Sequence, residues 1–350
     1  MKIAVYGANG FTGKLVAAEL ASHDIELVLA GRDLARLRDA ARQIGAPDAE
    51  PRASGLDEPA ALREVFQDCD AVINCVTPFS SFGEPVVRAA IAAGSHYVDI
   101  AGEQEYLKRI FDTYPGEAER AGVTVVPAMT DDGLPGDLIA SLTAARIGDA
   151  DDVTIADLRV PAGASRGTAR MALSNADELK SGGLTYEDGQ WTTGTRARLT
   201  SITPPGDHDP VPVVKFPLPG VVTVPRHVTA RHVEGVIRGE VAAIFTSVTA
   251  ELIDSMPEGP AEDARRAGQW LMMAQATSSS SGRRARGAVR GTDGYGVTAV
   301  IAAEGARRLA SGGVKPGVLA PSQAFDATGF LETLAPYGVR WHIDVDQLDS

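Results

Sequence analysis

The stretch from Lys2 to Gly13, Lys-Ile-Ala-Val-Tyr-Gly-Ala-Asn-Gly-Phe-Thr-Gly, decides the fold of this chain. Its apolar start, which stops at Gly7, is typical of a buried strand, and the residues from Phe11 onward have helical spacing. The three glycines at 7, 10 and 13 permit a tight turn, a close backbone approach to a pyrophosphate, and close helix–strand packing. The motif at this strand–helix junction predicts a dinucleotide-binding loop, with a ligand-free glycine turn as the alternative.

The first 130 residues continue this alternation of apolar runs and helical patterns. A strand, a helix and then another strand in regular succession require a parallel sheet with right-handed crossovers and helices on both faces. The fold class predicted for this half is therefore α/β, a Rossmann-type doubly wound parallel sheet. We expect strands at 2–6, 26–30, 70–76, 97–100 and 123–126, and helices at 11–21, 33–44, 56–66, 85–93.

The middle third has a different pattern. Alternating β-like segments between 153 and 248 are separated by turn signals such as Gly182-Gly183 and Asp188-Gly189. These features predict a second, α+β domain with a mainly antiparallel sheet. Helical patterns are expected again at 259–276 and 298–309. The predicted division is 1–130 for the dinucleotide domain, 131–290 for the substrate domain, and 291–350 for a segment that returns to the first domain.

The end of the second predicted strand selects the cofactor. Proteins that prefer NAD place an acidic residue there to bind the ribose 2′-hydroxyl. Here Arg32 occupies that region, and Arg36 follows on the next helical turn. Because a guanidinium suits a 2′-phosphate, we predict NADP(H) as the cofactor. The alternative is a solvated Arg32 with Asp33 bound to the ribose of NAD(H).

A third group of residues follows the strand that ends near Cys75. Thr77, Pro78 and Phe79 lie at the carboxyl edge of the predicted sheet, where dinucleotides bind. Alternatively, Pro78 only ends the strand and Phe79 belongs to the core. The predicted cofactor-binding residues are Gly7, Ala8, Asn9, Gly10, Phe11, Thr12, Gly13, Arg32, Arg36, Cys75, Thr77, Pro78 and Phe79.

Polar residues at the end of the next strand face the same predicted crevice. We predict Tyr97, Asp99 and Glu103 as the catalytic residues, because such groups donate protons or position a substrate. For Glu103 the alternative is a structural place at a helix start. No tyrosine has a lysine four residues later, which excludes the Tyr-x-x-x-Lys dyad of short-chain dehydrogenases as a template.

Composition limits the classes of partner and compartment. The chain has 350 residues, 44% hydrophobic and 23% charged, with a net charge of −13 that disfavours nucleic acid. Two cysteines, Cys69 and Cys75, and six scattered histidines give neither a disulfide framework nor a metal motif. The sequence predicts no signal peptide and no membrane span, so a cytoplasmic location is expected.

Four motifs together carry a resemblance to a known family. They are residues 7–13, Asn-Cys-Val-Thr-Pro-Phe at 74–79, Gly-Glu-Pro-Val-Val at 83–87, and His-Tyr-Val-Asp-Ile-Ala-Gly-Glu at 96–103. The chain resembles the saccharopine dehydrogenase-like reductases, in particular the bacterial branch of trans-acting enoyl reductases. At 130–137 it departs from the family pattern Gly-Phe-Asp-Ser-x-Pro-Ser-Asp, keeping Asp132, Pro135 and Asp137.

The resemblance implies an NADPH-dependent oxidoreductase. It would transfer hydride to an enoyl or carbonyl group of an acyl or polyketide-like small molecule, either free or carrier-bound, and a homodimer is one expected form. One alternative is a saccharopine dehydrogenase-like reduction of imines, for which Arg159, Arg166 and Arg170 could bind the substrate carboxylates. Another is a non-catalytic NADP(H)-binding protein.

Overall fold

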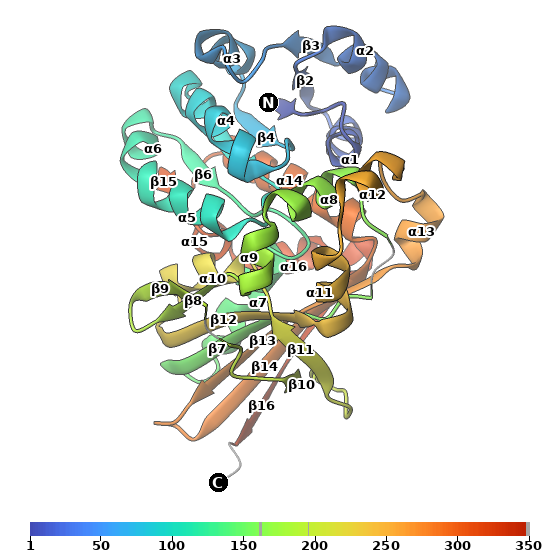
Figure 1. Cartoon of the computed structure of the whole chain (residues 1–350). Coiled ribbons are helices and arrows are strands. Elements are labelled where there is room, and N and C mark those ends of the chain that lie inside the picture. The colour runs from blue at the N-terminus through green and yellow to red at the C-terminus, as the bar shows by residue number, and fades with distance from the viewer. Residues whose placement is uncertain (161–162, 195, 348–350) are drawn as a thin grey trace.

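The first half of the chain folds around a parallel sheet with the strand order β15-β6-β5-β4-β1-β2-β3 (Figure 1). The computed structural model describes residues 1–160, 163–194 and 196–347. The strands of this sheet are β1 (Lys2–Tyr6), β2 (Glu26–Gly31), β3 (Glu50–Ala53), β4 (Ala71–Asn74), β5 (His96–Asp99), β6 (Thr124–Val126) and β15 (Gly317–Val318). Its helices are α1 (Phe11–Ala21), α2 (Leu34–Gln43), α3 (Pro59–Phe66), α4 (Phe79–Ala93), α5 (Gln104–Thr113), α6 (Pro115–Ala121) and α14 (Gly294–Ala310).

The central strands of the first sheet are buried on both faces, and β1, β2 and β4 are largely apolar, whereas the edge strand β3 is partly exposed. In β1, Ile3 and Val5 point into the core shared with α1 and α14, whereas Ala4 and Tyr6 point into the core under α3 to α6. This alternation places helices on both faces, as a doubly wound sheet requires. The predicted fold class is confirmed for this half.

The second half forms a mixed sheet, with strand order β10-β11-β12-β7-β13-β14-β16 and the hairpin β8–β9 attached to β12. Every pairing in it is antiparallel except β7 with β12, so the prediction of a mainly antiparallel second sheet is also confirmed. The strands are β7 (Ala150–Asp157), β8 (Leu184–Glu187), β9 (Gln190–Thr193), β10 (Ser201–Ile202), β11 (Val211–Lys215), β12 (Ala230–Arg238), β13 (Gln269–Ser278), β14 (Arg283–Thr292) and β16 (Arg340–Gln347).

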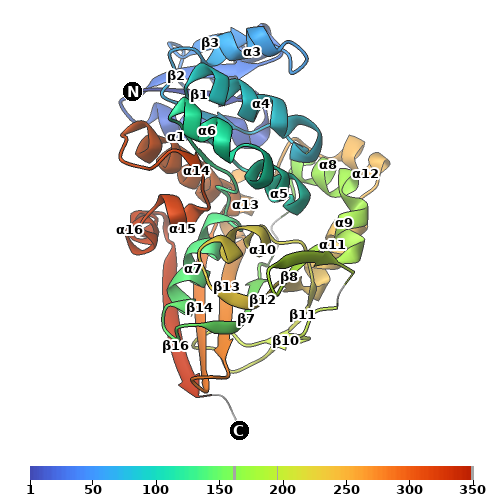
Figure 2. The same ribbon diagram turned by 90° about the vertical axis from the view of Figure 1, so that its left-hand side faces the viewer.

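Helices connect and cover this second sheet. Helix α7 lies along β13 and β14, while α8, α9, α11 and α12 gather between the two sheets (Figure 2). The C-terminal segment contributes a strand to each sheet, because β15 pairs with β6 and β16 pairs with β14. The helices are α7 (Leu134–Ala144), α8 (Arg166–Ser174), α9 (Ala176–Ser181), α10 (Gly220–Thr223), α11 (Gly239–Thr246), α12 (Ala250–Ser255), α13 (Glu262–Ala267), α15 (Pro321–Ala324) and α16 (Ala327–Thr333), with 3-10 turns η1 (Val224–Arg226) and η2 (Ala335–Tyr337).

Two predicted helices differ from the structure. The segment 259–276 was expected to be helical, but only α13 is helical there, and β13 follows from Gln269. Its Leu, Met, Ala and Gln residues favour helices, yet pairing with both β7 and β14 overrides that preference. Helix α4 begins at Phe79 rather than at Pro85, because a distant carboxylate, described below, binds its first N–H groups.

None of the helices in the described part of the chain combines the length and the apolar character that crossing a membrane requires.

Candidate functional site

The glycine loop between β1 and α1 is built by close backbone contacts. Gly7 has a φ of +84°, which favours glycine, and its N–H donates to the Ala30 carbonyl at 2.8 Å. A Cβ on Gly13 would lie 2.2 Å from the Gly7 carbonyl oxygen, so only glycine lets α1 approach the loop this closely. Gly10 precedes α1 without any side-chain cap, which leaves the first turn open to an anion.

The residues after β2 carry positive charge. Arg32 and Arg36 are exposed and line the same cleft as the glycine loop. Within the described residues, neither guanidinium has a hydrogen-bonding or ion-pair partner on the protein. Asp33 is the N-cap of α2, and its carboxylate accepts hydrogen bonds from the N–H groups of Ala35 and Arg36, at 2.9 and 3.1 Å. Because capping engages Asp33, the geometry favours a 2′-phosphate on the arginines over a ribose on Asp33.

The loop after β4 faces the glycine loop and is held by Glu103. The Glu103 carboxylate accepts hydrogen bonds from the N–H groups of Phe79 and Ser80, at 2.6 and 2.7 Å. Asn175 donates to the same carboxylate at 3.1 Å. Glu103 therefore supplies the N-terminal cap of α4 from outside that helix, and it fixes the loop in which Thr77 lies.

These elements surround one cleft of about 1310 Å³. Most predicted cofactor-binding residues line it, whereas Ala8 and Gly13 are buried behind the loop. The glycine cradle, which added Cβ atoms would fill, and the two arginines fit a phosphorylated dinucleotide. The predicted cofactor-binding residues that line the cleft are Gly7, Asn9, Gly10, Phe11, Thr12, Arg32, Arg36, Cys75, Thr77, Pro78 and Phe79.

Of the three predicted catalytic residues, only Glu103 lines the cleft. Tyr97 and Asp99 are fully buried beneath it. The Asp99 carboxylate accepts hydrogen bonds from the hydroxyls of Tyr97 and Tyr106, at 3.0 and 2.8 Å, and from two backbone N–H groups. Burial raises the pKa of Asp99 to about 6. This network ties the end of β5 to the start of the loop after β6, and a role of Tyr97 and Asp99 in the chemistry stays a prediction.

A charged cluster from the second half forms part of the cleft wall. The Arg159 guanidinium donates to Asp157 at 2.6 Å and to Asp131 at 3.2 Å. Asp132 lies beside them and accepts a hydrogen bond from the Thr130 hydroxyl. Burial, together with the charge of Asp131, raises the pKa of Asp132 to about 6. Three carboxyl groups therefore share one guanidinium, which favours a proton on one of them near neutral pH.

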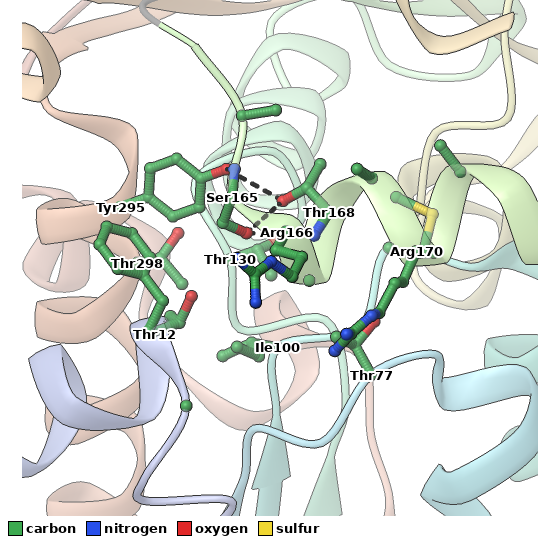
Figure 3. A pocket seen from close by; sticks show the side chains of 18 of the residues that line it. Thr12, Thr77, Ile100, Thr130, Ser165, Arg166, Thr168, Arg170, Tyr295 and Thr298 are labelled. Carbon is green, nitrogen blue, oxygen red and sulfur yellow. Dashed lines mark hydrogen bonds between the residues drawn. The ribbon is translucent and has the colours of Figure 1, made fainter. Parts of the chain in front are cut away.

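The hydroxyl groups of Ser165, Thr168 and Tyr295 form a hydrogen-bonded chain that lines the cleft (Figure 3). The Tyr295 hydroxyl accepts a hydrogen bond from the Ser165 N–H at 2.7 Å and lies 2.9 Å from the Thr168 hydroxyl. The Tyr295 ring also packs edge-on against Phe11 of the glycine loop, with 5.2 Å between ring centroids. Helix α14 thus joins the cofactor side of the cleft to the start of α8.

Comparisons with known proteins agree with this geometry. Residues 3–126 match the family model of the saccharopine dehydrogenase NADP binding domain. The chain is 28% identical over 233 residues to a saccharopine dehydrogenase-like oxidoreductase of Bos taurus, covering 61% of this chain and 50% of that protein. It is 33% identical over 141 residues to a trans-acting enoyl reductase of Mycobacterium ulcerans, covering 39% and 34% respectively.

A solved structure resembles the whole chain. Apo saccharopine dehydrogenase (L-Glu forming) from Saccharomyces cerevisiae aligns with a TM-score of 0.65 and 15% identity, over 99% of both chains, which shows a shared fold. The chain spans half or less of the length of the curated relatives described above. The fold and cleft define a dinucleotide-binding protein. The match of residues 3–126 to the saccharopine dehydrogenase NADP binding domain confirms the resemblance and the NADP(H) prediction.

Sequence reasoning did not identify several residues of the cleft. Asp132 was noted only as a motif match, although its place after β6, at the carboxyl edge of the sheet, was a usable signal. Tyr295, Ser165 and Thr168 gave no signal, because only the tertiary structure brings α14 to the distant start of α8. Lys14 also lines the cleft, where it pairs with Glu258 at 2.7 Å.

Proposed function

We propose that this chain is an NADPH-dependent reductase that transfers hydride to an enoyl or carbonyl group of an acyl substrate. The observation that carries the proposal is the composition of the cleft, which joins the NADP binding domain to a largely apolar wall from α11 and α12. Bound NADPH would supply the hydride from its nicotinamide ring. The glycine loop would hold the diphosphate, and Arg32 and Arg36 would hold the 2′-phosphate.

Asp132 is our proposed proton donor. Hydride addition to an enoyl group leaves negative charge on the substrate oxygen and requires a proton at the α-carbon. Asp132 lines the cleft, and its raised pKa of about 6 lets a fraction of it stay protonated near neutral pH. The Tyr295 hydroxyl is proposed to donate a hydrogen bond to the substrate oxygen while it accepts one from the Thr168 hydroxyl.

We propose positioning roles for the predicted residues Tyr97, Asp99 and Glu103. Glu103 holds the first turn of α4, next to Thr77 and Pro78. The Asp99 carboxylate holds the N–H groups of Ala101 and Ala128 under the cleft, and the Tyr97 hydroxyl donates to that carboxylate. If these residues were replaced, the backbone beneath the cleft would shift and the substrate would be displaced from the cofactor. The reaction rate would then fall although none of the three residues contacts the substrate.

The imine alternative has weaker support in the side chains. Saccharopine-type chemistry requires cations that bind two or more carboxylates. Arg159 is engaged by Asp131 and Asp157, and Arg166 donates to the Met256 carbonyl. Of the three arginines considered for this role, only Arg170 has no protein partner among the described residues. One available guanidinium suits a substrate with a single anionic group.

Oxidation of NADPH by the purified full chain, measured as loss of its absorbance, tests the proposed function. The substrates are matched enoyl, keto and imino compounds with medium-length acyl chains. We expect turnover with enoyl or keto compounds and an at least tenfold lower kcat/KM with imines. Turnover confined to imines would favour the saccharopine-type reaction. Saturable NADPH binding without oxidation by any compound would favour the non-catalytic alternative.

A further inference from the structure

An apolar surface lines the second-domain side of the cleft. It consists of Met171 on α8, Phe216 after β11, Val241, Ile244 and Phe245 on α11, and Leu252 on α12, and we call it the α11 trough. Helices α11 and α12 both pack against α8, and α11 also packs against α9, so these side chains come from one cluster of helices. Within this trough, Phe216 and Phe245 pack with ring centroids 5.4 Å apart.

The trough is open although it is apolar. Ile244 and Leu252 are 50% and 45% exposed, which makes them two of the most exposed large hydrophobic residues of the described chain. Large aliphatic side chains exposed beside a cofactor crevice mark a surface that an apolar ligand would cover. Val241 and Phe216 are buried behind them and give the trough a firm base.

Arg170 places a positive charge in the same cleft. It is exposed, it lines the cleft, and it has no ion pair or hydrogen bond with the protein within the described ranges. Its side chain extends from α8 toward Thr77, at the cofactor crevice (Figure 3). Helix α8 approaches this loop so closely that a Cβ on Gly167 would lie 3.1 Å from the Thr77 methyl group.

Glu103 and Glu178 also line this part of the cleft, but neither forms an ion pair with Arg170 in the described residues. Both oxygens of Glu103 accept hydrogen bonds from the N–H groups of Phe79 and Ser80. Burial raises the pKa of Glu178 to about 7, and the nearby charges of Glu105 and Glu103 add to this effect. The guanidinium of Arg170 thus stays available to a ligand, and its planar donors suit a carboxylate.

We propose that the cleft binds an unbranched acyl chain with one carboxylate, which pairs with Arg170 while the chain lies along the α11 trough. The inference rests on the proposed function and narrows its substrate class. A neutral ester or an amine of the same length would bury the same apolar area but would lose the pairing with Arg170. A short dicarboxylate would leave the trough uncovered, and with the cofactor bound to Arg32 and Arg36 its second carboxylate would lack an unpaired arginine.

The test measures binding rather than turnover. A dansyl-labelled undecanoic acid is titrated into the full chain, with and without NADPH, and is then displaced by dodecanoate, methyl dodecanoate or dodecylamine. We expect saturable binding of the probe and displacement by dodecanoate at concentrations about tenfold below those needed for the ester or the amine.

Substitutions separate the two parts of the site. Arg170→Gln should weaken dodecanoate about tenfold and leave the ester unchanged. Lys180→Gln, on the exposed surface of α9 and outside the cleft, is the matched control. Ile244→Ser should weaken dodecanoate and the ester by similar factors. Leu173→Ser is its control, because Leu173 is 40% exposed on α8 but does not line the cleft.

Several results would overturn the inference. The first is the absence of saturable probe binding, and the second is equal affinity for dodecanoate and its methyl ester. The third is an Arg170→Gln variant that binds NADPH more weakly but binds dodecanoate as the wild type does. In the last case Arg170 serves the cofactor. If NADPH oxidation fails while dodecanoate still binds through Arg170, only the proposed reaction is refuted. If oxidation proceeds without carboxylate preference, only the carboxylate-bearing substrate class is refuted.

Discussion

Replacing Arg32 by alanine tests the assignment of the cofactor site most directly. Arg32 lies at the end of β2, is exposed, lines the cleft, and has no protein partner among the residues that the structure describes. Its removal therefore breaks no intramolecular ion pair and exposes no buried group. Any effect on cofactor binding reports on the contact with the cofactor itself.

The expected magnitude follows from the chemistry of that contact. A hydrogen bond to a charged group contributes about 1.5–3 kcal/mol, and solvent exposure of Arg32 favours the lower end. Since about 1.4 kcal/mol corresponds to a factor of ten, the Kd for NADPH should rise about tenfold. NADH has no 2′-phosphate, so its Kd should change by less than about threefold. The ratio of the two constants is thus the informative quantity.

Isothermal titration of both cofactors into the wild type and the variant provides the measurement. Arg38→Ala is the control, because Arg38 is exposed on the same helix and does not line the cleft. The preference for NADPH should also weaken at higher salt, as expected for an exposed charge contact. Equal losses of NADPH and NADH affinity, or an effect of Arg38→Ala as large as that of Arg32→Ala, would refute the assignment of the 2′-phosphate to Arg32.

Three further predictions concern the loop, the cap of α4 and the proposed proton donor. In Gly13→Ala, the new Cβ would lie 2.2 Å from the Gly7 oxygen, so the affinity for NADPH should fall at least about tenfold. Gly239→Ala is the control in the same titration: its new Cβ has its nearest neighbour at 3.9 Å, so the variant should bind NADPH normally. Glu103→Ala should lower the free energy of unfolding in urea by about 2–4 kcal/mol, because two N–H groups of α4 lose a charged acceptor; a loss below about 0.5 kcal/mol would contradict this role of Glu103. For the proposed reductase, kcat/KM should decline as the pH rises through about 6, because Asp132 loses its proton there. The Asp132→Asn variant should be slow and should lack this decline. If its pH profile of kcat/KM equals that of the wild type, Asp132 is not the proton donor.

The residues that we propose for the cofactor lie in segments whose structure was largely predictable from the sequence. Gly7 is required by its positive φ and Gly13 by its close contact with the Gly7 carbonyl, both within a single strand–turn–helix unit, so their spacing is visible in the chain itself. Arg32 and Asp33 follow directly on the second strand, at a position that the repeating βα pattern fixes. Local order along the chain was sufficient for these predictions.

The substrate half was not predictable in the same way. Residues 269–276 have helix-favouring side chains, yet they form β13 because two neighbouring strands offer it pairing partners. Glu103 could be placed at a helix start from sequence, but its bonds to the first N–H groups of α4 depend on how α4 packs beside β5. The pairing of Arg159 with Asp131 likewise joins residues from different segments of the chain.

The sequence by itself determined the parallel sheet, the glycine loop and the class of cofactor, since each depends on residues that are neighbours along one βαβ unit. Only the tertiary structure decided which polar groups remain free for a ligand. Arg159 pairs with Asp131 and Arg166 with the Met256 carbonyl, both from distant segments, whereas Arg170 is exposed in the cleft beside an open apolar surface. The physical reason is that a side chain's availability depends on every group packed around it, and such groups come from segments far apart in the chain.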